Sequence, residues 1–177
     1  MQHPDEIESI LFDEKAIDTK ISELAKRLED EYVNKDLLLV GILRGGFIFL
    51  ADLVRKLNLD CMVDFMCLSS YASDKSTGVV NVLMDLHTPI EGKDVLIVED
   101  IVDTGLTTHY VRESLSEQRP RSLEVCALLD KPDSRKVPLH PKYVGFVVPN
   151  AFVVGYGLDY DGYYRNLPYV GILKVKA

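Results

Sequence analysis

The chain has 177 residues, of which 47% are hydrophobic and 27% charged, and its 20 basic and 28 acidic residues give a net charge of −8. This length suits a single domain over residues 1–177, and the composition excludes disordered and fibrous classes. The acidic balance disfavours an extended nucleic-acid surface, because basic side chains supply most of the non-specific affinity for phosphate backbones. We therefore expect no nucleic acid partner.

Features of other protein classes are missing from the sequence. The first ten residues, MQHPDEIESI, hold no apolar segment of signal-peptide length, and no run approaches the roughly 18 apolar residues of a membrane span. The three cysteines have neither the spacing nor the nearby histidines that indicate zinc. We expect a cytoplasmic protein with no membrane partner.

In chain order, hydrophobic periodicity alternates between helix and strand. The pattern predicts helices over residues 14–32, Phe47–Leu57 and Thr107–Glu117. It predicts strands over Leu37–Leu43, Cys61–Leu68, Val79–Leu86, Asp94–Val98, Ser122–Leu129, Tyr143–Val148 and Phe152–Val154. The alternation indicates an α/β fold with a twisted, mostly parallel sheet flanked by helices. The aromatic-rich tail from Tyr156 to Tyr169 is expected to form a small cap over one end of the sheet.

The segment Val95–Thr108, VLIVEDIVDTGLTT, places three carboxylates at the end of an apolar strand. Ligands of open α/β sheets collect outside the carboxyl ends of strands. Glu99 and Asp100 are adjacent, so on an extended strand they point to opposite faces and need not share one role. The backbone amides of Thr104–Thr108 would form a phosphate-binding nest at a helix N-terminus. The alternative is that the acids are solvated turn residues, with Asp103 or Thr104 capping the helix.

Val98–Thr107 resembles the phosphoribosyl-diphosphate (PRPP) motif of the type I phosphoribosyltransferases, in which two acids contact the ribose diols and a loop holds the 5′-phosphate. Further segments are similar, in order and spacing, to the hypoxanthine-guanine branch of that family: Leu43–Gly46, Ser70-Tyr71, Lys131 and Phe152–Arg165. The resemblance covers about residues 10 to 173. It implies the fold of that family, with a hood built from the terminal segments.

The resemblance also implies roles for the three acids. Asp103 would be the general base that takes the N7 proton of the purine, and Glu99 and Asp100 would contact the ribose diols. Mg²⁺ would be the cofactor, with Glu99, Asp100 and Asp159 as its predicted protein ligands. This ion suits the site because it keeps waters and binds through few carboxylates plus substrate oxygens.

Contacts to PRPP and its phosphates are implied for a larger set of residues: Arg44, Gly45, Glu99, Asp100, Asp103, Thr104, Gly105, Leu106, Thr107 and Arg165. The peptide bond that precedes Arg44 is often cis in the family. Leu106 replaces a lysine of some relatives, so a phosphate contact there is either missing or made by the backbone.

The purine would contact Lys131 through its O6 atom, stack on Phe152 and meet the backbone of Val153, with Asp159 nearby. Spacing alone would favour a solvated turn for Lys131 and a core position for Phe152.

The polar segment Ser69–Gly78, SSYASDKSTG, is predicted to be a loop. The pair Ser70-Tyr71 resembles the flexible loop of the family, which closes over the site and excludes water. A mobile surface loop without a role is the alternative.

The expected reaction joins hypoxanthine or guanine to PRPP and releases IMP or GMP and diphosphate. Two alternatives stay open: the same chemistry on xanthine, uracil or another base, and a regulator of the same fold that senses PRPP or nucleotides. The resemblance further implies a homodimer or homotetramer.

Overall fold

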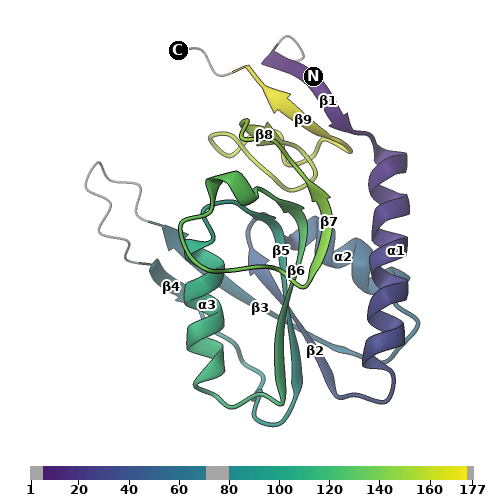
Figure 1. The fold of residues 1–177 in the computed structure, drawn as a ribbon, viewed down its shortest axis with the longest axis vertical. Helices are drawn as coiled ribbons and strands as arrows, with labels where there is room; N and C mark the ends of the chain where they lie inside the picture. The colour runs from purple at the N-terminus through teal and green to yellow at the C-terminus, as the bar shows by residue number, and fades with distance from the viewer. Residues whose placement is uncertain (1–5, 71–79, 175–177) are drawn as a thin grey trace.

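The computed structural model describes residues 6–70 and 80–174, which form two β-sheets (Figure 1). The larger sheet has the strand order β4-β3-β2-β5-β6-β7, and the smaller one, the hood, has the order β1-β9-β8. The larger sheet contains β2 (Leu37–Leu43), β3 (Met62–Ser70), β4 (Val80–Met84), β5 (Asp94–Val102), β6 (Ser122–Asp130) and β7 (Tyr143–Val147). The remaining elements are β1 (Ile7–Phe12), α1 (Glu14–Tyr32), α2 (Phe47–Lys56), α3 (Leu106–Ser116), a 3₁₀ turn (Pro132–Ser134), β8 (Val153–Val154) and β9 (Val170–Leu173).

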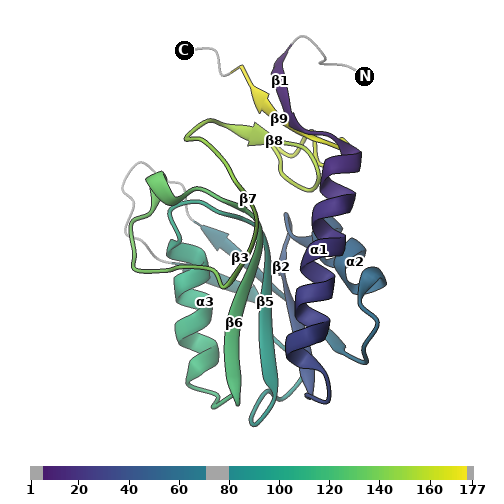
Figure 2. The ribbon, with the colours of Figure 1, turned by 45° about the vertical axis from the view of Figure 1, so that its right-hand side comes forward.

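The larger sheet is parallel except at one edge. β2 pairs in parallel with β3 and β5, and the parallel pairing continues through β6 to β7, whereas β4 runs antiparallel to β3. Figure 2 shows α3 on one face of the sheet and α1 and α2 on the other. Helices on both faces bury most of the central strands β2, β5 and β6, which explains their continuous apolar runs. The predicted α/β fold is confirmed.

Successive residues of β5 belong to different halves of the core. Leu96 and Val98 pack in the apolar cluster that contains α1 and α2, whereas Val95 and Ile97 pack in the cluster that contains α3. This alternation is the two-residue period of a strand. It places the next two residues, Glu99 and Asp100, on opposite faces of the sheet.

Several predicted boundaries were wrong by a few residues. β5 runs to Val102, so Glu99 and Asp100 lie inside the strand, and β3 runs to Ser70 into the segment predicted as a loop. The N-cap of α3 is Gly105, which has a φ of 79°. The prediction that Asp103 or Thr104 caps this helix was therefore wrong, because the backbone turns into the helix one residue later.

The hood covers the end of the larger sheet where β5 and β6 finish (Figure 1). β1 and β9 pair antiparallel, with Ile7 opposite Leu173, and β8 adds to β9. The terminal segments thus build the expected cap. The strands β1 and β9 were not predicted, because each depends on a partner at the other end of the chain.

The described residues also bear on membrane spans and on the state of the cysteines. None of their helices is long and apolar enough to cross a membrane. The cysteines are free; Cys126 is buried, whereas Cys61 and Cys67 are half-buried.

Candidate active site

Two adjoining cavities open at the carboxyl ends of β2, β5 and β6, beneath the hood. The larger has a volume of about 490 Å³ and is lined by Arg44, Gly45, Leu68, Ser69, Asp100, Ile101, Asp103, Lys131, Phe152, Val153, Leu158, Asp159 and Arg165. The smaller has a volume of about 170 Å³ and is lined by Glu99, Ile101, Asp103, Thr104, Gly105, Thr107 and Thr108. Asp103 borders both cavities. The fold therefore brings together nearly all of the residues predicted for the site.

Glu99 and Asp100 line different cavities, because they lie on opposite faces of β5. Glu99 is buried and accepts a hydrogen bond from the hydroxyl of Thr108 on α3 at 3.1 Å. Burial and the nearby charge of Asp100 raise the pKa of Glu99 well above its usual range. Burial likewise raises the pKa of Asp100 to about 6. Both carboxyls therefore hold their protons more tightly than the same groups do in water.

The smaller cavity lies at the N-terminus of α3, where a helix offers backbone amides without intrahelical partners. Gly105 turns the chain with a φ of 79°, and Thr104 Oγ1 accepts a hydrogen bond from Leu106 N at 3.4 Å. Unpaired amides, the helix dipole and threonine hydroxyls favour a phosphate here. Leu106 does not line the cavity and its side chain is exposed, so only its backbone takes part in this loop.

Arg135 holds this loop from behind and was not predicted from the sequence. Its guanidinium donates to the backbone carbonyls of Asp103 at 3.1 Å and Val102 at 3.3 Å, and it forms an ion pair with Asp130. A Cβ on Gly105 would lie 2.8 Å from Arg135 Cδ, so the arginine packs directly against this glycine. No local signal could have revealed this residue, because it lies about 30 residues from the loop in a proline-rich segment.

Asp103 and Lys131 both line the larger cavity and contact each other there. Lys131 is only 6% exposed, and its Nζ lies 3.3 Å from Asp103 Oδ2. The expectation of a solvated turn at Lys131, based on spacing alone, is therefore wrong. Lys131 thus offers hydrogen-bond donors to this carboxylate and to a ligand in the same cavity.

The loop after β2 presses against Asp100. The Leu43–Arg44 peptide bond is cis, and a Cβ on Gly45 would lie 1.7 Å from Asp100 Oδ2. A Cβ on Gly157 of the hood would lie 2.2 Å from the carbonyl oxygen of Gly45. Only glycine allows three segments to approach this closely.

Asp159 and Arg165 complete the hood side of the larger cavity. Arg165 Nη2 lies 2.7 Å from Asp159 Oδ1, and its Nη1 donates to the carbonyl of Gly157 at 2.5 Å. Within residues 6–70 and 80–174, no group of three or more His, Cys, Asp and Glu side chains could hold a metal. The three predicted magnesium ligands are divided between the two cavities: Glu99 lines the smaller one, whereas Asp100 and Asp159 line the larger one.

Phe152 and Val153 add an apolar surface to the lining of the larger cavity. Phe152 is 43% exposed, so it is not the core residue that spacing alone would favour. Its ring meets the edge of Tyr160 with 5.4 Å between centroids. A planar base could stack on the free face of this ring.

The predicted closing loop lies mostly outside the described residues. Ser70 is the last residue of β3, and Tyr71 belongs to the part of the chain that the structure does not describe. Ser69, which precedes them, lines the larger cavity.

Comparisons with known proteins identify the family of the chain. Residues 8–161 match the model of the phosphoribosyl transferase domain family. The chain is 48% identical to the hypoxanthine-guanine phosphoribosyltransferase of Mycobacterium avium, over 99% of this chain and 90% of that protein. It is 46% identical to the enzyme of the same name from Bacillus subtilis, over 98% of this chain and 96% of that protein.

Among solved structures, a hypoxanthine phosphoribosyltransferase from Staphylococcus aureus superimposes with a TM-score of 0.94 and is 44% identical, over 98% of this chain and 95% of that one. The match extends through the larger sheet and the hood alike. The chain therefore belongs to the hypoxanthine-guanine phosphoribosyltransferases, within the phosphoribosyl transferase family.

Proposed function

We propose that the chain transfers the 5-phosphoribosyl group of PRPP to N9 of hypoxanthine or guanine, giving IMP or GMP and diphosphate, with Asp103 as the general base. The observation that carries the proposal is the place of Asp103, which borders both cavities and lies 3.3 Å from Lys131. A ribose bound between the two cavities would bring its reacting carbon close to this carboxylate.

The 5′-phosphate of PRPP would occupy the smaller cavity. The backbone amides at the start of α3 and the hydroxyls of Thr104 and Thr107 supply donors, and Gly105 leaves room for close approach. Glu99 and Asp100, reaching the site from opposite faces of β5, would accept hydrogen bonds from the ribose hydroxyls.

The diphosphate would lie in the larger cavity between Arg44, Gly45 and Arg165, because guanidinium groups present paired donors to phosphate oxygens. Asp100 and Asp159 line the same cavity and offer the oxygen ligands that suit Mg²⁺. With only these two carboxylates available, the ion would take its remaining ligands from PRPP and water. When bound, it would neutralise charge on the leaving diphosphate.

The purine would lie between Phe152 and Lys131. Lys131 Nζ would donate to O6, the Phe152 ring would stack on the base, and the backbone of Val153 would read its edge. Asp103 would accept the N7 proton as N9 bonds to the ribose carbon and the bond to diphosphate breaks. A buried ammonium that donates to O6 favours a 6-oxopurine over a base that lacks this acceptor.

The test compares kcat/KM for hypoxanthine, guanine, xanthine and uracil with PRPP and Mg²⁺, and repeats the best reaction with a chelator. We expect hypoxanthine or guanine to exceed uracil by at least about 10², because the buried polar groups would be left unpaired by the wrong base. Turnover with uracil alone, or full turnover without a divalent ion, would contradict the proposal.

We also propose that the protein acts in the cytoplasm as a homodimer or homotetramer. Light scattering on the purified full chain measures the assembly, and a monomeric mass would overturn that part of the proposal.

A further inference from the structure

Three consecutive residues of the hood have positive φ angles, and the middle one is a tyrosine. Gly155 has a φ of 96°, Tyr156 of 51° and Gly157 of 99°. Glycine adopts such angles freely, whereas an L residue with a side chain occupies the left-handed region only at a cost in free energy. Some contact of the Tyr156 side chain must compensate for this cost.

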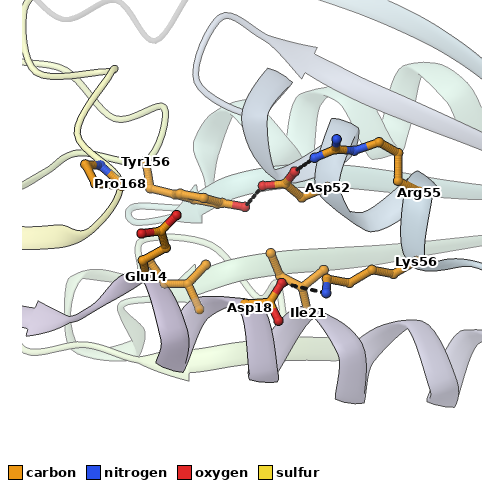
Figure 3. Close-up of a pocket in the computed structure, with 9 residues that line it drawn as sticks. Glu14, Asp18, Ile21, Asp52, Arg55, Lys56, Tyr156 and Pro168 are labelled. Carbon is orange, nitrogen blue, oxygen red and sulfur yellow. Dashed lines mark hydrogen bonds and ion pairs between the residues drawn. The ribbon is translucent and has the colours of Figure 1, made fainter.

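The compensating contact is a hydrogen bond to the neighbouring helix. The Tyr156 hydroxyl donates to Asp52 on α2, and Asp52 also forms an ion pair with Arg55 (Figure 3). Tyr156 is 7% exposed, and burial raises the pKa of its hydroxyl, which therefore stays protonated as a donor. The backbone N–H of Tyr156 donates to Leu167 O at 2.9 Å.

A cavity of about 390 Å³ lies beside this contact, between α1, α2 and the hood. Figure 3 shows the Tyr156 ring crossing from the hood toward Asp52, with the Lys56–Asp18 ion pair of 2.6 Å farther along the cavity. Phenylalanine is tyrosine without the hydroxyl, so it fits at position 156 without new contacts. The substitution therefore removes only the hydrogen bond to Asp52.

The residue after this tyrosine contacts both sides of the diphosphate region. A Cβ on Gly157 would lie 2.2 Å from the Gly45 carbonyl oxygen, and the Gly157 carbonyl accepts a hydrogen bond from Arg165 Nη1 at 2.5 Å. Asp52 lies in α2, which begins directly after Gly45 and Gly46. The Tyr156–Asp52 hydrogen bond therefore joins the hood segment that carries Asp159 and Arg165 to the helix that continues from the Arg44–Gly45 loop.

We infer that Tyr156 and Asp52 are positioning residues that set the distance between the two walls of the diphosphate pocket, one wall from the hood and one from the loop before α2. This inference rests on the proposed function, which places diphosphate between these walls. Lys131, which is proposed to bind the purine, follows β6 and belongs to neither of these walls.

The experiment compares Tyr156→Phe with Tyr143→Phe. Tyr143 is a matched control, because its hydroxyl donates to Glu31 on α1 at 2.5 Å and neither residue lines either cavity of the site. We expect Tyr156→Phe to raise KM for PRPP roughly tenfold, the effect of losing a hydrogen bond to a charged group, while KM for hypoxanthine changes less than twofold. Tyr143→Phe should lower Tm and leave both KM values unchanged.

Two substitutions of Asp52 test whether the hydrogen bond itself is responsible. Asp52→Asn keeps an oxygen acceptor for the tyrosine and should retain a nearly normal KM for PRPP. Asp52→Ala should reproduce the Tyr156→Phe value, and the double variant should show no further increase, because both changes remove one interaction. Equal rises in both KM values, or a fall in Tm alone, would overturn the inference.

Binding of magnesium diphosphate, measured by calorimetry, separates this inference from the proposed function. Absence of turnover by the wild-type protein with every base would overturn the proposed function. Weaker binding of magnesium diphosphate by Tyr156→Phe, with Tyr143→Phe unchanged, would still support the positioning role. Equal binding by both variants and the wild type would overturn it.

Discussion

The guanidinium of Arg135 donates a hydrogen bond from Nε to the backbone carbonyl of Asp103 at 3.1 Å, which ties the proposed general base to a segment about 30 residues away. The same side chain reaches the carbonyls of Val102 and Leu139 and pairs with Asp130. One arginine therefore satisfies several acceptors around the loop that would hold the 5′-phosphate. A lysine cannot present this planar set of donors.

Arg135→Lys should consequently lower kcat/KM for PRPP by about 10–10², because buried carbonyls lose their donors and the loop shifts. The matched control is Arg121→Lys, since Arg121 pairs with Asp94 at the opposite end of β5. Steady-state kinetics should show the loss in the first variant only. Equal losses in both, each following Tm, would mean that Arg135 has no more than a structural role.

Asp103→Asn should reduce kcat by about 10²–10⁴, because an amide cannot take the purine proton. The side chain keeps its shape and its place between the two cavities. PRPP affinity, measured by calorimetry, should therefore stay within a few-fold of the wild-type value. Unchanged turnover in this variant would rule out Asp103 as the base.

Gly45→Ala should abolish productive PRPP binding, because the new Cβ would lie 1.7 Å from Asp100 Oδ2 and displace that carboxylate. We expect kcat/KM for PRPP to fall by more than about 10², in line with the loss of several charge-assisted contacts. Gly92→Ala is the control: its φ is 75°, but no atom lies within 4 Å of the added Cβ. It should lower Tm through backbone strain and leave the kinetics unchanged.

Lys131→Gln should raise KM for hypoxanthine by about 10–10², because a hydrogen bond from a charged donor to the proposed O6 position becomes a neutral one. KM for PRPP should change much less, since Arg44, Gly45 and Arg165, and not Lys131, are proposed to hold its diphosphate. Steady-state kinetics with each substrate varied separately gives both values. A larger effect on PRPP than on the purine would contradict the proposed role.

The titration of Asp100 should lower the stability of the protein as pH rises from about 4 to about 6. Burial raises the pKa of Asp100 from its ordinary 3.8 to about 6, so the folded protein binds this proton more tightly than the unfolded chain. The free energy of unfolding therefore decreases through that interval and levels off above it. Asp100→Asn should flatten the decrease in Tm, measured by calorimetry from pH 4 to pH 7. A slope as steep as that of the wild type would refute this assignment.

The same titration predicts that PRPP and magnesium bind more tightly as pH rises through about 6, because the charged carboxylate is the form that holds a cation. Calorimetric titrations with magnesium diphosphate at pH 5 and pH 7 test this by comparing the wild type with Asp100→Asn, because diphosphate itself also titrates in this interval. The same pH dependence in both proteins would show that Asp100 takes no part in binding.

The sequence alone determined the α/β alternation and the separation of Glu99 from Asp100. Both are local properties: hydrophobic periods of 3.6 and 2 residues distinguish helix from strand, and adjacent residues of a strand must face opposite sides. The motif around Asp103 carried the family resemblance for a related reason, because its acids, glycine and threonines are contiguous in the chain.

The tertiary structure alone decided how distant segments meet. The contacts of Arg135 with the Asp103 loop, of Lys131 with Asp103 and of Tyr156 with Asp52 each join residues 28 to 104 positions apart. The pairing of Ile7 with Leu173 spans almost the whole chain. No short-range period encodes such contacts, since they arise only when the sheet, the helices and the hood pack together. For that reason the sequence indicated which groups carry the chemistry, and the packing decided which other residues hold those groups in place.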